Sequence, residues 1–425
     1  MQIDTSLELL PIENRTDLFY PDLNKNISRI TPTALSLLGL KNPKQKILRE
    51  FLQNNVGWQI LEESEIDNVL VYVIDALGYH QFMKYSKIMK KKFPTNGIEL
   101  SSVYPTITST AMVSIHLGEM PINHGIVGQR IRFAEIDNIV DTLTLRTEQL
   151  TFGDLERYGI NAKNWLWCEN PIPSGSNIDR IHLIESYITS SGLSHFINEN
   201  VKTLGYSSHI DSFAATKKIL ETPSENRRFL VLYSASVDSI THRYTTNSDV
   251  LRDEIQNIES HFFRMLKDLD PKVAKKTAVF ITADHGQENL YKENKISISY
   301  NEEDELRKLL KTRGRSGRVM HLFSNEGKHE ETIDWFKERI DDKGIIVTPK
   351  DYHKFMGKGA DSQRVIDRIG DIQIILGKNA AMFFGHSGEY DSDYHLGLNA
   401  THGSLSLDEL AVPLLLGKID DLLSK

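Results

Sequence analysis

Short apolar runs alternate with amphipathic segments along most of the chain from residue 68 onward. Residues 69–74, 228–233 and 277–282 form continuous apolar runs, as expected of strands that are covered on both faces. Between the last two runs, apolar side chains recur at helical spacing over 249–269. This spacing predicts an amphipathic helix with Asp249 near its N-cap. Strand, helix and strand in this order predict an α/β fold with a mostly parallel central sheet and helices on both faces.

Further elements flank this pattern. About the first 65 residues form a leader of helices and loops, with helix-like segments at 31–38 and 46–52. Residues 97–104 are a further candidate strand, which ends at Pro105, and 110–117 are typical of a helix. Strands and helices therefore alternate on both sides of the first apolar run.

The pattern breaks over residues 290–375, which are rich in charge and contain a helix-like run at 330–340. We interpret this stretch as an inserted cap, a small α+β subdomain. Core-like apolar runs resume at 372–376 and 381–384, so the last strands are expected to return to the main sheet. The predicted domains are a core of residues 1–289 and 376–425 and a cap of residues 290–375.

Composition narrows the class of protein. The net charge of -8 over 425 residues argues against a stable nucleic-acid complex, which needs a basic surface. The single cysteine, Cys168, excludes an intrachain disulfide and fits a reducing compartment. The N-terminus lacks the pattern of a signal peptide, and no apolar run reaches membrane-spanning length. These features predict a cytoplasmic protein without a membrane segment; they do not indicate an oligomeric state.

Acidic and histidine side chains follow the predicted strands. They are Asp75, Asp238, His242, Asp284, His285 and, before the final apolar run, His402. Because strand ends of an open α/β sheet meet at one edge, where ligands bind, these residues are expected to share a site. Three aspartates and three histidines suffice for two divalent metal ions, and such donors suit zinc, manganese or iron. Two ions about 3.5–4 Å apart can clamp an in-line phosphoryl displacement.

Hydroxyl groups cluster just before the predicted helix 110–117. Thr108 would place a nucleophile there, where a phosphate meets free backbone N–H groups and the positive end of the helix dipole. The alternative is that Thr106, Thr108, Ser109 and Thr110 only cap the helix. Taken alone these residues favour capping; beside six candidate metal ligands we prefer the nucleophile.

The ordered set of motifs resembles the type I phosphodiesterase/nucleotide pyrophosphatase family of the alkaline phosphatase superfamily. The similar stretches are residues 73–78, 104–111, 118, 123–128, 237–244, 281–286 and 402–406. The resemblance spans about residues 68 to 416, although 290–375 carries little of it. The motifs are specific because all of them occur in the family's order.

The resemblance implies a role for each matching residue. Asp238, His242 and His402 would bind one metal ion. The other would be bound by Asp75, Asp284 and His285, with Thr108 bridging to it as the nucleophile. The family's usual metal is zinc, and the reaction would pass through a phospho- or nucleotidyl-threonine. The expected substrate is a small phosphate ester, possibly a nucleotide.

Two departures from the family pattern concern substrate contacts. Animal members follow the nucleophile with Phe-Pro-Asn, whereas Ser109, Thr110 and Ala111 stand here. They also place an asparagine where this chain has Gln129. We therefore predict phosphoryl contacts from Ser109 and Gln129, together with an arginine cluster in the cap at Arg313, Arg315 and Arg318. The alternative for the arginines is a solvated basic face.

Other interpretations stay open. The hydrolase could cleave monoesters or phosphonates, since pocket contacts decide that choice. A phosphoglycerate mutase-like enzyme shares the sheet and the two-metal site but uses a serine nucleophile, and a binding protein with a dead site would be expected to have lost ligands. His116 and His124 are expected in structural roles. His386 and His395 either line the pocket or belong to a solvated loop.

Overall fold

The computed structural model describes residues 7–42, 44–147, 155, 159–198, 200–385 and 397–424. Its main sheet has seven strands: β1 (Asn68–Ile74), β2 (Gly97–Ser101), β6 (Ile178–Glu185), β7 (Lys202–Tyr206), β8 (Arg227–Ser234), β9 (Thr277–Thr282) and β18 (Ala411–Lys418). Their order is β2-β18-β9-β1-β8-β6-β7. Neighbours from β9 to β7 pair in parallel, whereas β18 runs antiparallel to β9 and β2. The predicted α/β fold with a mostly parallel sheet is confirmed.

The three apolar runs that carried this prediction form the centre of the sheet. β9 spans the predicted residues, β1 begins one residue earlier than predicted, and β8 extends one residue further at each end. All seven residues of β1 are buried, because helices cover both faces of the sheet. The candidate strand at 97–104 is shorter than expected and ends at Ser101.

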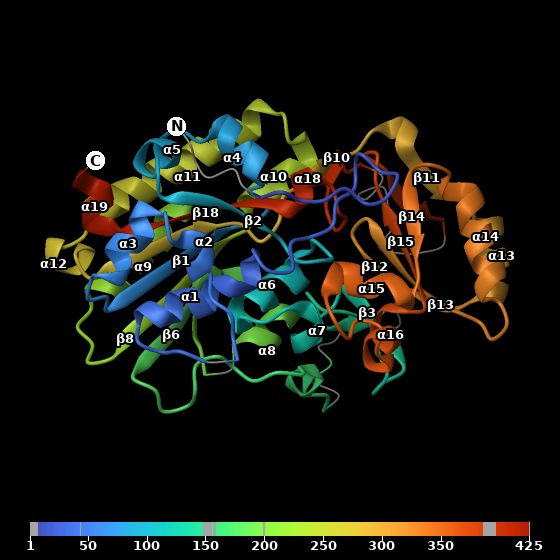
Figure 1. The fold of residues 1–425 in the computed structure, drawn as a ribbon, viewed down its shortest axis with the longest axis horizontal. Helices are drawn as coiled ribbons and strands as arrows, with labels where there is room; N and C mark the ends of the chain where they lie inside the picture. The colour runs from blue at the N-terminus through green and yellow to red at the C-terminus, as the bar shows by residue number, and fades with distance from the viewer. Residues whose placement is uncertain are drawn as a thin grey trace.

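Helices cover the main sheet on both sides. Figure 1 shows α4 (Tyr79–Tyr85) and α11 (Asp249–Lys267) on one side and α1 (Ile30–Leu37) and α6 (Thr108–Leu117) on the other. The helix predicted at 249–269 is α11, with Ser248 rather than Asp249 as the N-cap; the Ser248 side chain accepts a hydrogen bond from the backbone N of Leu251.

The remaining helices around this sheet are short, except for α9 with 13 residues. They are α2 (Arg49–Leu52), α3 (Val56–Glu62), α5 (Ile88–Lys92), α7 (Pro121–His124), α8 (Gly192–Ile197), α9 (His209–Glu221), α10 (Ser236–Tyr244), α12 (Pro271–Ala274), α18 (Leu407–Leu410) and α19 (Ile419–Ser424). The helix expected at 46–52 is reduced to α2, whereas α6 begins two residues earlier than expected, at Thr108.

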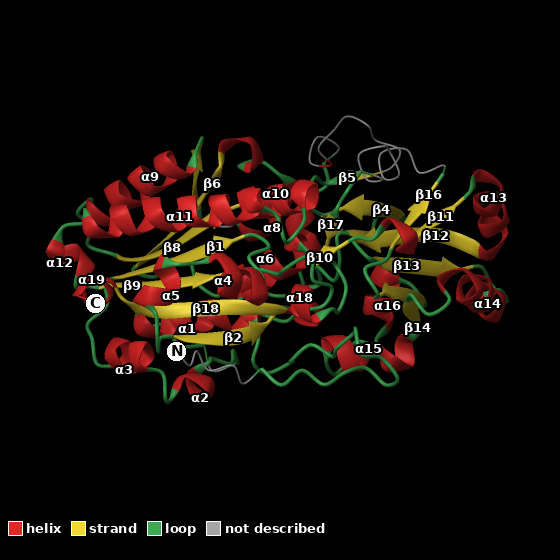
Figure 2. Cartoon of the chain, turned by 90° about the horizontal axis from the view of Figure 1, so that it is seen from above, coloured by secondary structure: helices red, strands yellow, loops and turns green. Residues whose placement is uncertain are grey.

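A second seven-stranded sheet lies beside the main one (Figure 2). Its strands are β3 (Arg130–Phe133), β4 (Asn138–Asp141), β5 (Arg146–Thr147), β12 (Leu310–Ser316), β13 (Val319–Ser324), β14 (Gly344–Val347) and β15 (Ile372–Leu376). The order is β14-β15-β13-β12-β3-β4-β5, and all these pairs are antiparallel. The inserted stretch therefore shares its sheet with residues 130–147, which directly follow the α6 and α7 region.

The expectation that 372–376 and 381–384 return to the main sheet is wrong. Residues 372–376 are β15, which lies between β13 and β14, and β16 (Ala381–Phe384) pairs with β11 (Lys295–Ile298). A continuous apolar run indicates burial on both faces but does not identify the partner strand. Of the strands after residue 375, β18 is the one in the main sheet. The division into a core and a cap stays a prediction.

Both faces of the second sheet carry helices of the inserted stretch. α13 (Tyr300–Leu309) and α14 (His329–Ile340) pack with β13 and β15 in one apolar cluster, and α15 (Pro349–Met356) and α16 (Gln363–Ile369) belong to another. The helix predicted at 330–340 is confirmed as α14.

Two general expectations can be compared with the described residues. No helix among them combines the length and apolarity needed to cross a membrane. Cys168 is partly buried, and burial raises the pKa of its thiol to about 12, which fits an inert rather than a nucleophilic cysteine.

Candidate two-metal site

Six predicted ligand residues meet at the carboxyl edge of the main sheet. Asp75 directly follows β1, Asp284 and His285 follow β9, Asp238 and His242 lie on α10 after β8, and His402 follows β17 (Ala400–Thr401). They form two groups, in each of which one ligand atom per residue lies within 4.8 Å of the others. The sequence thus predicted which residues come together; their role as ligands stays a prediction.

The first group, Asp75, Asp284 and His285, is fully buried. The Nε2 atom of His285 lies 3.5 Å from Asp75 Oδ1 and 3.3 Å from Asp284 Oδ2. The other oxygens are anchored by the protein. The backbone N–H groups of Ala76 and His285 donate to Asp284 Oδ1 at 3.1 and 3.0 Å, and the Tyr233 hydroxyl donates to Asp75 Oδ2.

The unanchored atoms of this group fit a bound cation. Asp75 Oδ1 and Asp284 Oδ2 are buried and have no hydrogen-bond partner among the described residues. His285 Nδ1 contacts the Gly286 carbonyl at 3.1 Å and donates to it, so Nε2 turns its lone pair toward both carboxylates. A cation placed between these three electron-rich atoms would offset their mutual repulsion.

Burial and like charge shift the titration of this group. Burial, followed by the charges of Asp284 and Asp238, raises the pKa of Asp75 well above its usual range. Burial raises the pKa of Asp284 to about 6 and lowers the pKa of His285 to about 4. A divalent ion would remove the cost of keeping both carboxylates ionised, and carboxylate oxygen with neutral imidazole is a donor set that suits zinc or manganese.

The second group, Asp238, His242 and His402, is less buried. Asp238 Oδ1 lies 3.3 Å from His242 Nε2 and 3.6 Å from His402 Nε2. Both rings donate through Nδ1 to backbone carbonyls: His242 to Ala400 at 2.7 Å and His402 to Thr106 at 2.9 Å. The Nε2 atoms are therefore oriented as metal-ligand histidines are, with the second nitrogen fixed by a hydrogen bond.

Charge is balanced within this second group. Burial alone would raise the pKa of Asp238, but His242 and then His402 lower it below its usual range. Burial opposes protonation of His242, yet Asp238 raises the pKa of that histidine. Burial lowers the pKa of His402 to about 3. Without a cation, Asp238 and His242 can therefore form an ion pair.

Thr108 lies between the two groups and the open cavity. Its Oγ1 is 3.1 Å from His285 Nε2, and the rings of His285 and His402 stack with centroids 3.9 Å apart. Thr108 is the first residue of α6, whose earliest backbone bond runs from Ala111 N to the Ile107 carbonyl at 2.9 Å. The N–H groups before Ala111 thus have no intrahelical acceptor and suit a phosphoryl oxygen.

The predicted phosphoryl contacts have partners in the protein. Ser109 is buried, and its Oγ donates to the Gly128 carbonyl at 3.4 Å. Gln129 Nε2 donates to Asp141 Oδ2 at 3.5 Å, and its backbone N donates to Ser316 Oγ at 2.9 Å. The backbone N–H of Ser109 remains at the start of α6. The contribution of either side chain to binding stays a prediction.

The three cap arginines do not form a cluster facing Thr108. Arg313 pairs with Glu303 at 2.9 Å, and Arg315 Nε donates to the Gly317 carbonyl at 2.7 Å. Arg318 is fully buried and pairs with buried Glu409 at 2.8 Å. None of the three lines the cavity next to Thr108 described below. Substrate binding by these residues stays a prediction.

Four further histidines were considered in the sequence analysis but were not predicted to bind a metal ion. His116 and His124 are buried, and His124 Nδ1 accepts from the backbone N of Ile126 at 3.1 Å while Nε2 contacts Ser114 Oγ at 2.9 Å. His124 thus holds a turn, as expected. His386 and His395 lie outside the described residues.

Two side chains that orient the ligands were not predicted. Tyr233 contacts Asp75, and Gln287 donates through Nε2 to the backbone carbonyl of Asp238 at 3.1 Å and to its Oδ1. A signal for Tyr233 existed, since it is the last residue of the predicted strand 228–233, where side chains that follow the strand ends were expected to meet. Gln287 follows Asp-His-Gly directly, but nothing local indicates that it reaches Asp238.

A hairpin of the second sheet touches the second ligand group. The backbone N of Arg318 donates to the carbonyl of His402 at 3.0 Å. Gly317, at the turn between β12 and β13, has φ +57°, and a Cβ there would lie 1.9 Å from the same carbonyl oxygen. Only glycine, which has no Cβ, lets the hairpin backbone come this close to the His402 carbonyl. With the Arg318–Glu409 pair, the hairpin fixes the loop that carries His402.

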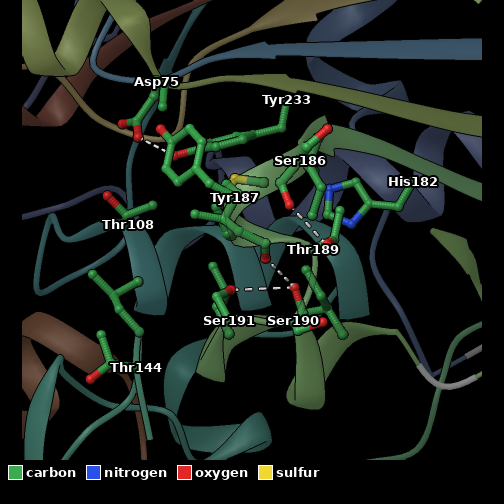
Figure 3. A pocket seen from close by; sticks show the side chains of 18 of the residues that line it. Asp75, Thr108, Thr144, His182, Ser186, Tyr187, Thr189, Ser190, Ser191 and Tyr233 are labelled. Carbon is green, nitrogen blue, oxygen red and sulfur yellow. Dashed lines mark hydrogen bonds between the residues drawn. The ribbon is translucent and has the colours of Figure 1, made fainter. Parts of the chain in front are cut away.

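A cavity of about 680 Å³ opens beside these groups. Asp75, Asp238 and Thr108 line it, together with residues of β6, α8 and the segment between them. Figure 3 shows Asp75, Tyr233 and Thr108 around one part of this space, and His182, Ser186 and Ser191 around another. A cavity of this size accommodates a small-molecule substrate.

Comparison with known proteins identifies related sequences and folds. The family profile of type I phosphodiesterase/nucleotide pyrophosphatase matches residues 71–404. No curated protein matches the chain. Murine ectonucleotide pyrophosphatase/phosphodiesterase 5 superposes with a TM-score of 0.58 at 16% identity, over 81% of this chain and 87% of that chain. An inactive variant of the same murine protein, in complex with AMP, superposes with a TM-score of 0.56 at 15% sequence identity, over 83% of this chain and 87% of that chain.

A bacterial enzyme shares the fold as well. Phosphonoacetate hydrolase from Sinorhizobium meliloti, in complex with phosphonoformate, gives a TM-score of 0.56 at 15% identity, over 85% of this chain and 95% of that chain. At these identities the likeness establishes a common fold.

Proposed function

Because this chain belongs to the type I phosphodiesterase/nucleotide pyrophosphatase family, we propose that it hydrolyses phosphodiester or nucleotide pyrophosphate bonds with Thr108 as the nucleophile. The observation that carries this proposal is the position of Thr108 Oγ1, 3.1 Å from His285 Nε2 at the start of α6. A hydroxyl there has a metal-ligand group on one side and unpaired backbone N–H groups behind it.

The donor sets support two divalent ions, zinc or alternatively manganese. Asp75, Asp284 and His285 would hold one ion, and Asp238, His242 and His402 the other. Such ions supply Lewis-acid stabilisation of phosphoryl oxygens and make hydroxyl groups and water more acidic. The buried oxygens of Asp75 and Asp284 that have no protein partner support a cation in the first group.

The chain's own groups account for positioning and for the covalent step. Attack by Thr108 Oγ1 forms an O–P bond and breaks the bond from phosphorus to the leaving oxygen, which departs with a proton. Water then breaks the Oγ1–P bond and restores the hydroxyl. Backbone N–H groups at the start of α6 would bind the phosphoryl oxygens in both steps.

A nucleotide is the favoured kind of substrate, since a structural neighbour is known in complex with AMP. Phosphonate or monoester hydrolysis is the second candidate, supported by the neighbouring phosphonoacetate hydrolase. The mutase alternative has less support, because the family match extends over 71–404 and a threonine occupies the nucleophile position.

The test is turnover of a chromogenic nitrophenyl phosphodiester and the matching monoester by the zinc- or manganese-loaded protein. We expect diester hydrolysis that falls at least about 10³-fold in Thr108→Ala, because the variant lacks the hydroxyl proposed to form the intermediate, while both metal ions are retained. Thr110→Ala is the matched control, since it removes another buried hydroxyl of α6. Full turnover by Thr108→Ala would exclude it as nucleophile, and a preference for the monoester would favour the second candidate.

A further inference from the structure

The cavity beside Thr108 continues well beyond the two ligand groups. Its walls include apolar side chains of α6 and α8 and a series of hydroxyl groups from Ser186 to Ser194. Figure 3 shows Ser186, Thr189, Ser190 and Ser191 along this wall. A scissile phosphoryl group at Thr108 fills only a small part of 680 Å³, so the walls must contact another part of the substrate.

Apart from the two ligand groups, the charge in the described lining of this cavity is positive. Its lining contains two acids, Asp75 and Asp238, and both belong to the ligand groups. The lining also contains the exposed Arg146 of β5. Within the part of the chain that the structure describes, the Arg146 guanidinium has no carboxylate or hydrogen-bond partner. Away from the ligand groups, the cavity therefore presents a cation without a counter-charge.

The wall formed by β6 adds a second observation. His182 lines the cavity and is buried, and its Nε2 has no partner among the described residues. Two residues earlier on β6, buried Arg180 lines a separate cavity and donates to the His116 carbonyl at 3.2 Å. No described carboxylate pairs with Arg180, whose Nε and Nη1 are also unpaired. A buried guanidinium without a carboxylate gives this wall a positive potential.

We propose that this cavity binds the part of the substrate beyond the scissile phosphoryl group, and that this part carries an acidic group, a carboxylate or a second phosphate, held by Arg146. The inference rests on the proposed function and adds the substrate class. A guanidinium forms paired hydrogen bonds to either anion, and the hydroxyl wall supplies further donors. A cationic group at this end of the cavity would instead be repelled by Arg146, which has no carboxylate partner among the described residues.

The experiment compares two nitrophenyl diesters of equal chain length, one with a terminal carboxylate and one with a terminal methyl group. We expect the metal-loaded protein to prefer the carboxylate diester about tenfold in kcat/KM, chiefly through KM, with a preference that weakens as salt increases. Arg146→Gln should lower the ratio of the two kcat/KM values about tenfold, and Arg146→Lys should restore part of it. A third diester of equal length that ends in a phosphate group shows whether the site prefers a phosphate or a carboxylate.

Arg132→Gln is the matched control. Arg132 lies on β3 of the same sheet, pairs with Asp137 and does not line the cavity, so its loss should leave the ratio unchanged. An equal kcat/KM for both diesters, or an equal ratio in Arg146→Gln, would overturn the inference while leaving the diesterase proposal intact.

A binding measurement separates failure of the inference from failure of the proposed function. Carboxyalkyl and alkyl phosphonates of equal length are titrated calorimetrically into the metal-loaded protein and into Arg146→Gln. Tighter binding of the carboxylate ligand that depends on Arg146 would support the acidic-group site even if no diester were hydrolysed. Equal affinity for the two phosphonates would overturn it whatever the turnover.

Discussion

The two ligand groups have similar donors but opposite charge balance. Asp75 and Asp284 face one histidine whose pKa is lowered by burial, so the first group has an excess of negative charge. Asp238 faces two histidines, and one of them, His242, has a raised pKa. A cation in the first group would thus offset carboxylate charge, whereas in the second group it would compete with protons for the Nε2 atom of His242.

The groups also differ in what holds them. Asp75 and Asp284 follow β1 and β9, which are neighbours in the main sheet. His402 belongs to a loop that the β12–β13 hairpin fixes through Gly317 and Arg318. The comparison teaches that the carboxylates of the first group follow two paired strands of the main sheet, whereas the loop of His402 also depends on contact with a hairpin of the second sheet.

Removing one ligand from each group gives the largest expected effect. Asp284→Asn and His402→Ala should each lower turnover roughly 10³-fold or more, because each ion contributes several kcal/mol to the transition state. Metal content should fall from two ions toward one, measured by elemental analysis after gel filtration. Asp253→Asn, an exposed acid paired with Arg252, is the control. Two ions in both variants would refute the assignment of ligands.

Gly317→Ala tests the dependence on the hairpin. The new Cβ would force the His402 carbonyl to move, so turnover should fall roughly 10²-fold, in the range seen when groups that orient a metal ligand are lost. The ion in the second group should be lost first. Gly327→Ala is the matched control, because Gly327 also has a positive φ but a Cβ added there would meet no atom within 4 Å. Equal metal content and turnover in the two variants would contradict the comparison.

Smaller effects are expected from the side chains that orient each group. Tyr233→Phe should weaken metal binding in the first group about tenfold, because Asp75 loses its hydrogen bond. Competition with a fluorescent chelator measures the affinity. Tyr206→Phe removes a phenol that donates to the Tyr233 carbonyl at 2.8 Å and should leave affinity unchanged. An equal loss in both variants would indicate general damage instead.

The pH dependence of the metal-free protein should reflect the excess charge of the first group. Between 3.8 and about 6, folded Asp284 retains a proton that the unfolded chain has lost. The free energy of unfolding should therefore fall as pH rises through this window, by roughly 1–2 kcal/mol. Asp284→Asn should flatten this slope in chelator-treated samples followed by thermal unfolding. The same slope in both proteins would contradict the raised pKa.

The sequence predicted the centre of the main sheet, and that six aspartate and histidine residues meet at its edge, because each signal is local. Asp75 follows an apolar run directly, and Asp284 and His285 follow another, so strand ends and chemistry appear in the same few residues. The second sheet could not be predicted in this way, since β3 pairs with β12 across a long separation and periodicity does not specify partners. Arg318 was predicted to be a substrate contact or part of a solvated basic face, because its buried partner, Glu409, is distant in sequence.

The position of β18 in the main sheet has a consequence for the order of folding. β18 lies between β2 and β9 although it follows both in the chain, and Leu414 pairs with Ile98 about 300 residues away. Such long-range closure is slow. Before it occurs, β2 has no neighbour in the sheet and His402 has no fixed place. A newly made or refolding chain would therefore acquire its hydrolytic activity late, after the sheet has closed.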